Sequence, residues 1–218
     1  LRNTCARALA VGAGDAGSLD HRRFALDVIN CLGFGLNSDN DDGDPPFARE
    51  AADFLRPRLD TEQDPYALRA VVAAFTGYCS REELPAVLAL ADHPDPGVRH
   101  GVSLAVPTLL ADGVDALGIL LSVADDPDPI VRTNALHTLT RVPADTPALR
   151  DVLLANLSDT HFEARLEAAI ALALRGDERG TPVLDEIRRG IRNLGSRGAG
   201  RLDDLRHQLG VRGRTGLP

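Results

Sequence analysis

A short segment that recurs at a fixed interval constrains the fold of this chain more than any other feature. The stretch ADHPDPGVRHGV aligns residue for residue with ADDPDPIVRTNA, and LSDTHFEARLEA keeps the pattern without the prolines. Each copy carries an arginine at the same place, and Arg99, Arg132 and Arg165 are spaced by 33 residues. A looser copy with Arg69 comes before them. Self-similarity at such a period is typical of solenoids, in which each unit buries its apolar face against its neighbours.

Each copy predicts a pair of helices joined by a tight turn. An aspartate followed by proline suits the start of a helix, because the carboxylate accepts a hydrogen bond from the first turn and proline has no N–H to lose there. This dipeptide occurs three times, as Asp64-Pro65, Asp95-Pro96 and Asp128-Pro129. Other helices are expected to begin at the caps Thr146 and Thr181. Pro107 lies inside a helical pattern and is expected to kink or end its helix.

The composition agrees with helices and argues against several classes of protein. Of the 218 residues, 44% are apolar and only 4% are aromatic, and Ala, Leu and Val dominate the apolar set. No stretch predicts a membrane span, and residues 1–10 lack the apolar core of a secretory signal, so we expect a cytoplasmic protein. The cysteines Cys5, Cys31 and Cys79 are far apart and odd in number, which predicts small buried thiols rather than disulfides or a zinc site.

The motif D-x-D-P-x-V-R, with the Ala and Leu positions behind it, resembles the HEAT repeat family across roughly residues 47–194. The likeness is greatest to the short bacterial HEAT-like repeats of phycobilin lyases. This resemblance implies an all-α fold, a right-handed α-solenoid of about five stacked antiparallel helix pairs. It also implies a structural ladder between neighbouring repeats. The ladder residues would be Asp92 with Arg99, Asp125 with Arg132, and Arg165, where Ser158 replaces the aspartate.

The pattern divides the chain into a helical body and a basic end. Residues 1–194 form the predicted solenoid, with a degenerate repeat at 1–36, an acidic loop at 37–46 and clear repeats over 47–194. Residues 195–218 form a Gly- and Arg-rich C-terminal cap or tail. Residues 188–218 hold eight arginines against two acids, whereas residues 1–187 carry a net charge of −14. Three interpretations of the tail remain open: it is solvated and disordered, it folds back on the acidic body, or it contacts nucleic acid.

The sequence contains hints of chemistry, but each has a simpler structural explanation. The G-x-G-x-x-G pattern at 12–17 follows a segment that reads as helix, so it predicts a turn between helices rather than a dinucleotide site, which needs a preceding strand. The aspartates of the 37–46 loop fail the register of a calcium loop, because Ser38 and Arg49 fall where carboxylates are required. The six histidines show no catalytic spacing. We therefore predict no catalytic residue, no metal site and no cofactor.

One face of the second helix of each pair is the predicted partner-binding surface. Positions one and five residues after the motif arginine share a helical face that packing between the helices does not need. In a solenoid this face lines the concave surface. The residues at these positions are His100, Leu104, Thr133, His137, Leu166 and Ile170. Leu166 and Ile170 are both apolar, so they predict either a binding patch or a site covered by the C-terminal segment, and cover is the favoured interpretation for these two.

The predicted function is a non-catalytic scaffold or adaptor that binds another protein, by analogy with other solenoids. Two alternatives remain. HEAT-like alkylpurine DNA glycosylases have a similar architecture, but they use a basic groove with tryptophans, whereas this chain has an acidic body and no Trp. A nucleic-acid role through the arginine-rich tail belongs to the same alternative. A phycobilin-lyase-like, chromophore-handling subunit is the second, although the sequence shows no motif that defines such a site.

Overall fold

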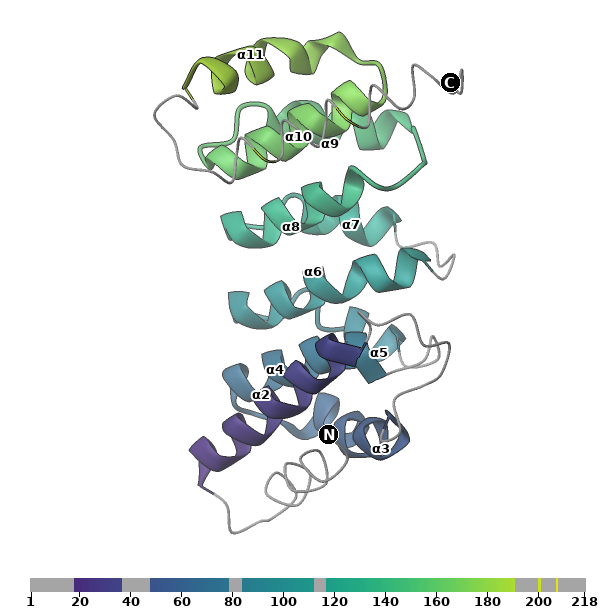
Figure 1. Cartoon of the computed structure of the whole chain (residues 1–218), viewed down its shortest axis with the longest axis vertical. Helices are drawn as coiled ribbons and strands as arrows, with labels where there is room; N and C mark the ends of the chain where they lie inside the picture. Colours follow the sequence, from purple (N-terminus) through teal and green to yellow (C-terminus); the bar gives the residue numbers. More distant parts are fainter. Residues whose placement is uncertain are drawn as a thin grey trace. The chain divides into compact units, whose positions relative to one another are not determined.

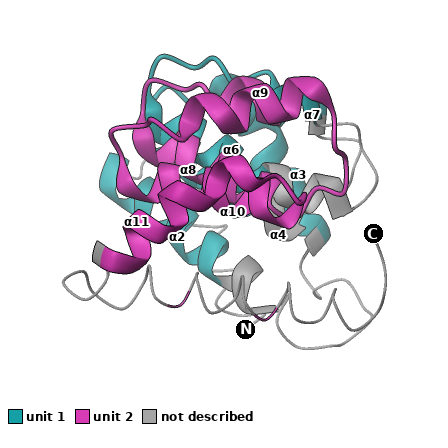
Figure 2. Ribbon diagram, turned by 90° about the horizontal axis from the view of Figure 1, so that it is seen from above, with its two compact units in different colours: residues 1–119 teal, residues 120–218 magenta. Residues whose placement is uncertain are grey.

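The computed structural model describes residues 18–36, 48–78, 84–111 and 117–190, together with Gly200 and His207 (Figure 1). Every regular element in these ranges is helical, with ten α-helices and one short 3-10 helix. The prediction of an all-α fold built from packed helices is therefore confirmed. The chain divides into two compact units, residues 1–119 and 120–218 (Figure 2). Each unit is described by itself below.

Three long helices pack side by side in the first unit. They are α2 (Leu19–Leu36), α4 (Pro65–Tyr78) and α6 (Pro96–Ala111), and α4 contacts both of the others. The helices that precede α4 and α6 in the chain, α3 (Ala48–Thr61) and α5 (Leu84–Leu88), each pack on the helix that follows (Figure 1). This arrangement is the helix pair that the repeats predict. Among the described residues of this unit, α4 supplies more of the core than any other helix, including Ala67, Leu68, Val71, Val72, Ala74 and Phe75.

A glycine allows α4 and α6 to approach closely. A Cβ atom added at Gly101 of α6 would lie 3.2 Å from Cγ1 of Val72 and 3.3 Å from the carbonyl oxygen of Arg69, both on α4. These distances are shorter than ordinary van der Waals contact between carbon and its neighbours. Gly101 thus fixes how near the two helices lie, and it holds the exposed edges of α4 and α6 next to each other.

The second unit is organised around one buried helix, α10 (Phe162–Leu174). It packs against α8 (Pro129–Leu139), α9 (Pro147–Asn156), the 3-10 helix η2 (Glu178–Gly180) and α11 (Thr181–Gly190). The remaining helix, α7 (Leu117–Val123), spans the division between the units. Alanines on α10 let its neighbours approach from several sides, because they bury the backbone without adding bulk. The fully or nearly buried residues of α10 are Ala164, Leu166, Ala168, Ala169, Ile170, Ala171, Leu172 and Leu174.

The predicted helix caps depend on local hydrogen bonds, and most of them are present. Asp128 accepts from the backbone N–H groups of Ile130 and Val131 at the start of α8. Asp64, Asp95 and Thr146 cap α4, α6 and α9 in the same manner. Thr181 differs from the prediction, because it is the first residue of α11 and follows directly on η2. The N-cap of that short helix is Asp177.

One further expectation is narrowed, one is corrected, and several lie outside the described residues. Helix α6 runs through Pro107 to Ala111, so the proline does not end the helix, and the alternative of a kink stays a prediction. Cys31 is exposed rather than buried, because it lies on the side of α2 away from the core. The described residues do not include Cys5, Cys79, the 12–17 glycine pattern or the 37–46 loop, and of residues 195–218 they include only Gly200 and His207.

Candidate partner-binding site

The motif arginine of α8 makes a two-pronged ion pair with an aspartate of the next repeat. Arg132 donates from Nε to Oδ2 of Asp159 at 2.7 Å and from Nη2 to Oδ1 at 2.9 Å. Its Nη1 donates to the carbonyl oxygen of Asp126 at 2.7 Å. The hydrogen bonds between the two groups lower the pKa of Asp159 below its ordinary value and raise the pKa of Arg132 above its ordinary value. A ladder between repeats therefore exists here, as the family resemblance implies.

The acid in this ladder is one residue later than predicted. Asp159 aligns with Asp126, not with Asp125, and its Oδ1 also accepts from the backbone N–H of His161 at 2.7 Å. This local hydrogen bond orients the carboxylate of Asp159 so that it also accepts from the guanidinium of Arg132. Asp92 and Asp125 are exposed, and in the described part of the chain neither carboxylate bonds to a motif arginine.

All three motif arginines also hold the turn that precedes their own helix. Each donates from Nη1 to the carbonyl oxygen six residues earlier, at 2.8 Å for Arg99 and His93, 2.7 Å for Arg132 and Asp126, and 2.7 Å for Arg165 and Asp159. A planar guanidinium presents five N–H donors in a rigid fork, so one arginine can hold several acceptors in a fixed geometry. The motif arginines thus belong to the framework that positions the second helices.

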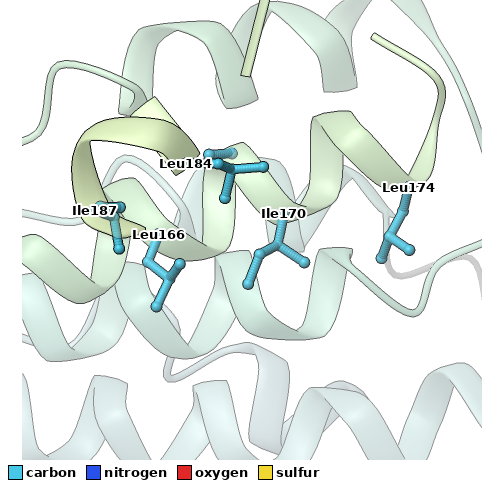
Figure 3. Packing of buried hydrophobic residues seen from close by; sticks show 6 residues of the cluster. Leu166, Ile170, Leu174, Leu184 and Ile187 are labelled. Atoms are coloured by element: carbon cyan, nitrogen blue, oxygen red, sulfur yellow. The ribbon is translucent and has the colours of Figure 1, made fainter. Parts of the chain in front are cut away.

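In the second unit, the predicted partner-binding residues are engaged within the fold. Leu166 and Ile170 are only 1% and 2% exposed, because Leu184 and Ile187 of α11 pack over them (Figure 3). Helix α11 belongs to the part of the chain that the sequence predicts as solenoid, so cover by the C-terminal segment stays a prediction. Burial under α11 nevertheless leaves neither Leu166 nor Ile170 exposed to a partner. The physical reason is that α11 is strongly amphipathic and buries its apolar side on α10.

The polar members of the predicted surface in the second unit also have internal contacts. Thr133 donates from Oγ1 to the carbonyl oxygen of Pro129 at 2.7 Å, a back-bond within α8. His137 places Nδ1 3.3 Å from Oε2 of the buried Glu167 on α10. Neither side chain is fully exposed. This face of α8 therefore contributes to packing against α10 as well as to the surface.

In the first unit, the same face forms a small hollow. Its volume is about 130 Å³, and it lies across α2, α4 and α6. The lining residues are Asp27, Asn30, Tyr66, Arg69, Ala70, Ala73 and Leu104. Leu104, one of the predicted partner-binding residues, is 37% exposed, and Tyr66 is 46% exposed. His100, one helical turn before Leu104, is half-buried. The structure thus joins Leu104 to residues of α2 and α4 that sequence reasoning missed.

The rim of the hollow is held by hydrogen bonds between α2 and α4. Tyr66 donates from its hydroxyl to Oδ2 of Asp27 at 2.9 Å, and this bond raises the pKa of Tyr66. Arg23 donates from Nε and Nη2 to the two carboxylate oxygens of Asp64, at 2.8 and 2.6 Å. The guanidinium of Arg23 also lies 5.2 Å from the centre of the Tyr66 ring, within the range of a cation–π contact. Tyr66 is therefore fixed in its exposed position.

A helical pattern could have identified part of this lining. Tyr66, Arg69, Ala70 and Ala73 have the spacing i, i+3, i+4 and i+7 that marks one face of a helix. This face carries a tyrosine and an arginine on its exposed part, and these residue types are enriched at protein interfaces. The signal was weak because the copy that contains Arg69 is looser than the later copies, and the repeat at 1–36, which supplies the α2 residues, is degenerate.

The described residues were also compared with the patterns of a metal site and of a membrane-spanning helix. No group of three or more His, Cys, Asp or Glu side chains among them is arranged to hold a metal ion. No helix in the described ranges is long and apolar enough to cross a bilayer.

Comparisons with known proteins identify the family. The family model for HEAT repeats matches residues 52–140 and 117–190. No curated protein sequence matches this chain. The crystal structure of YibA from Escherichia coli is similar, with 15% sequence identity over 97% of this chain and 76% of that one, and a TM-score of 0.66. An engineered protein is also similar, with 14% identity over 95% of this chain and 98% of that one, and a TM-score of 0.53.

At such low identities these two likenesses concern the fold alone. The closer resemblance to phycobilin-lyase repeats stays a prediction. The HEAT match covers well over half of the residues, and the helix pairs of both units agree with it. The chain therefore belongs to the HEAT-repeat family.

Proposed function

We propose that this chain is a non-catalytic protein-interaction scaffold that binds a partner protein on the exposed face of α2, α4 and α6. The observation that carries the proposal is the hollow lined by Tyr66, Arg69 and Leu104. Interfaces are enriched in tyrosine and arginine and are centred on apolar contacts. Stacked repeats suit this task, because neighbouring helices present side chains over an extended surface.

The size of the hollow supports a protein partner over a small-molecule substrate. Sites for drug-sized ligands measure roughly 300–1,000 Å³ and bury most of the ligand. The hollow is only about 130 Å³, so it suits one or two side chains of a larger partner. Its lining contains no Ser, Cys, Thr or His, the residues that most often supply the nucleophile and the base of acyl transfer.

Charge supports a protein partner over nucleic acid for this face. Residues 1–187 carry a net charge of −14, which repels phosphate groups. The lining of the hollow contains one acid, Asp27, and one base, Arg69, so it offers no basic track along which a nucleic-acid backbone could lie. A protein surface of mixed polarity meets no such repulsion.

Affinity capture tests this function. The purified chain is used as bait in a native lysate of the source organism, with washes at low and high salt, in three forms: wild type, Leu104→Arg and Ile130→Arg. Ile130 is the control because it is 54% exposed and lies outside the hollow. We expect a stoichiometric protein to remain at high salt on the wild type and on Ile130→Arg, and to decrease about tenfold on Leu104→Arg.

Two results would contradict the proposal. Equal capture by Leu104→Arg and wild type would show that the α2–α4–α6 face is not the binding surface. Capture of nucleic acid that is released at high salt, with no protein retained, would assign the interaction to counterion release and hence to a basic segment.

A further inference from the structure

The motif arginine of α10 has the same position as that of α8, but one edge of its guanidinium is unfilled. Arg132 and Arg165 each donate from Nη1 to the carbonyl oxygens six and five residues earlier. In Arg132 the opposite edge, formed by Nε and Nη2, binds the carboxylate of Asp159 at 2.7 and 2.9 Å. In Arg165 the same edge bonds to no residue that the structure describes. Among the described residues, Arg165 therefore ends the ladder with an open position for a carboxylate.

Two backbone hydrogen bonds hold Arg165 in place before any partner binds. Its Nη1 lies 2.7 Å from the carbonyl oxygen of Asp159 and 3.3 Å from that of Thr160, and the residue is half-buried. A side chain that is already fixed loses less conformational entropy on binding than an arginine that rotates freely at the surface. Arg165 thus presents a pre-formed fork for a planar acceptor with two oxygens.

The chain has no acid of its own at the position where the ladder would continue. The acid of the existing pair, Asp159, comes 27 residues after Arg132. The residue 27 positions after Arg165 is Arg192, and residues 187–202 contain no Asp or Glu. The next repeat therefore does not supply an equivalent of Asp159, so the carboxylate that fits Arg165 has to come from elsewhere.

The end of α11 lies at the same end of the helix pair as Arg165. Figure 3 shows Ile187 of α11 at the Leu166 end of the buried cluster, away from Leu174. Arg165 directly precedes Leu166, and Arg189 follows Ile187 by two positions. The last turn of α11 is therefore near the first turns of α10, where Arg165 is fixed.

A basic stretch begins at this end. In the last turns of α11, Arg188 pairs with Asp185 at 2.8 Å, and the formal charges of Arg189 and Glu186 cancel. Residues 188–218 carry eight arginines against two acids, so the stretch that starts beside Arg165 has a strong excess of positive charge. Charge complementarity favours a ligand in which the carboxylate is flanked by further acids.

We propose that Arg165 binds an aspartate or glutamate from an acidic segment of a partner protein, in the geometry that Asp159 has on Arg132. Nε and Nη2 donate to the two oxygens of the carboxylate, and the basic stretch at 188–218 attracts the neighbouring acids. This site lies within the second unit and goes beyond the scaffold function proposed for the face of α2, α4 and α6. The competing ligand is a phosphate group of nucleic acid, which can also accept from both nitrogens.

The test uses the full chain and a dye-labelled hexa-aspartate peptide with blocked ends. Binding is followed by fluorescence anisotropy at about 0.15 M salt, where weak attraction between distant charges is largely screened. The variants are Arg165→Lys and the control Arg141→Lys, at an exposed site in the second unit. Both variants keep the positive charge, and both replace the two-pronged guanidinium by an ammonium group. A hexa-asparagine peptide controls for contacts with the peptide backbone.

We expect Arg165→Lys to bind hexa-aspartate about tenfold more weakly than the wild type, because lysine cannot donate from two fixed nitrogens. Arg141→Lys should change the affinity by no more than about twofold, and hexa-asparagine should not bind. A second measurement needs no variant to fold. In the wild type, the NMR signal of the Nε–H of Arg165, assigned through its own backbone, should move when the peptide is added. The Nε–H signal of Arg132 should stay in place, because its carboxylate is already bound.

Four results would overturn the inference. Equal affinity of wild type and Arg165→Lys would show attraction by net charge alone, and the absence of binding and of any shift at millimolar peptide would exclude the site. Single-stranded DNA that moves the Arg165 signal at lower concentration than the peptide would replace the carboxylate by a phosphate. A signal that moves in the double variant Asp203→Asn, Asp204→Asn without peptide would mean that the chain's own acids fill the position. The face of α2, α4 and α6 is tested separately, by the lysate capture.

Discussion

The guanidinium of Arg132 on α8 forms a bidentate ion pair with the carboxylate of Asp159, with Nε 2.7 Å from Oδ2 and Nη2 2.9 Å from Oδ1. The side chain of Asp159 is only 6% exposed and that of Arg132 16% exposed. This pair joins one repeat to the turn that opens the next, so it stabilises the stacking of α8 and α10 rather than either helix alone. Paired, low-exposure geometry of this kind contributes more than a solvated surface ion pair.

Replacing the ladder aspartate should lower stability, and replacing its exposed neighbour should not. Asp159→Ala removes two charge-assisted hydrogen bonds and leaves Arg132 without its carboxylate, so we expect the free energy of unfolding to fall by about 1–3 kcal/mol. Asp125→Ala, at the position that the sequence predicted for the ladder, should change it by less than about 0.5 kcal/mol. Urea unfolding followed by circular dichroism measures both. Equal losses would contradict the assignment of Asp159.

The same pair predicts a dependence of stability on pH. Hydrogen bonds from Arg132 hold the pKa of Asp159 below its ordinary value of 3.8. Since the folded pKa is the lower one, the pair stabilises the fold fully above the ordinary value, and this contribution disappears as the pH falls through the folded pKa. The pKa values of Asp64 and Asp177 are also lowered, mainly by Arg23 and Arg179, so acid should weaken the whole fold.

Asp159→Asn isolates the contribution of this carboxylate to the pH dependence. The variant has no group to protonate at position 159, so its unfolding free energy should fall less steeply than that of the wild type below about pH 4. The urea midpoint is measured at a series of pH values for both proteins. Parallel curves for wild type and variant would show that Asp159 titrates alike in the folded and unfolded chains.

Replacing the glycine at the end of η2, Gly180, by alanine should destabilise the fold. A Cβ atom at Gly180 would lie 2.8 Å from the carbonyl oxygen of Ala169 and 3.3 Å from its Cα, both backbone atoms of α10. Because backbone atoms cannot swing aside, Gly180→Ala should cost about 1–3 kcal/mol. Gly118 of α7 has open space around it, so Gly118→Ala should be neutral or stabilising by up to about 1 kcal/mol. Thermal unfolding of both variants measures this difference, and similar melting temperatures would contradict it.

The packing of α11 on α10 predicts that loosening α11 exposes apolar surface. Ile187 is 4% exposed and packs in the same cluster as Leu166 and Ile170. Truncation by Ile187→Ala should cost about 2–5 kcal/mol, and fluorescence of an apolar dye should rise as α11 loosens. Ile130→Ala removes the same atoms from a side chain that is 54% exposed and should change both readings little. An unchanged dye signal in Ile187→Ala would mean that α11 does not shield these residues.

Local features of the fold could be predicted from the sequence because their causes lie within a few residues. The caps Asp64, Asp95 and Asp128 depend on hydrogen bonds to amides two or three positions later, so a short motif contains all that is needed. Thr181 was misplaced because the residues before it form a 3-10 turn, with Asp177 as its cap. The start signals of η2 and α11 are therefore adjacent in the sequence, and local signals alone do not show which of them begins the α-helix.

The candidate site could be predicted only in part. Leu104 and Ile170 occupy equivalent positions, five residues after their motif arginines, yet Leu104 is exposed beside a hollow and Ile170 is buried under α11. Nothing within either repeat distinguishes them, because the difference comes from which helix packs over each one. Asn30 and Arg69 are 39 residues apart and share the hollow only because α2 packs beside α4.

The sequence by itself determined the repeat, the helix pairs and their family, since periodicity and capping act over a few residues and recur in every copy. Only the tertiary structure decided that Arg132 bonds to Asp159, that Leu166 and Ile170 are covered, and that a hollow opens beside Leu104. The physical reason is distance along the chain. Contacts between residues tens of positions apart depend on how closely whole helices approach, and small residues such as Gly101 and Gly180 set that approach through packing.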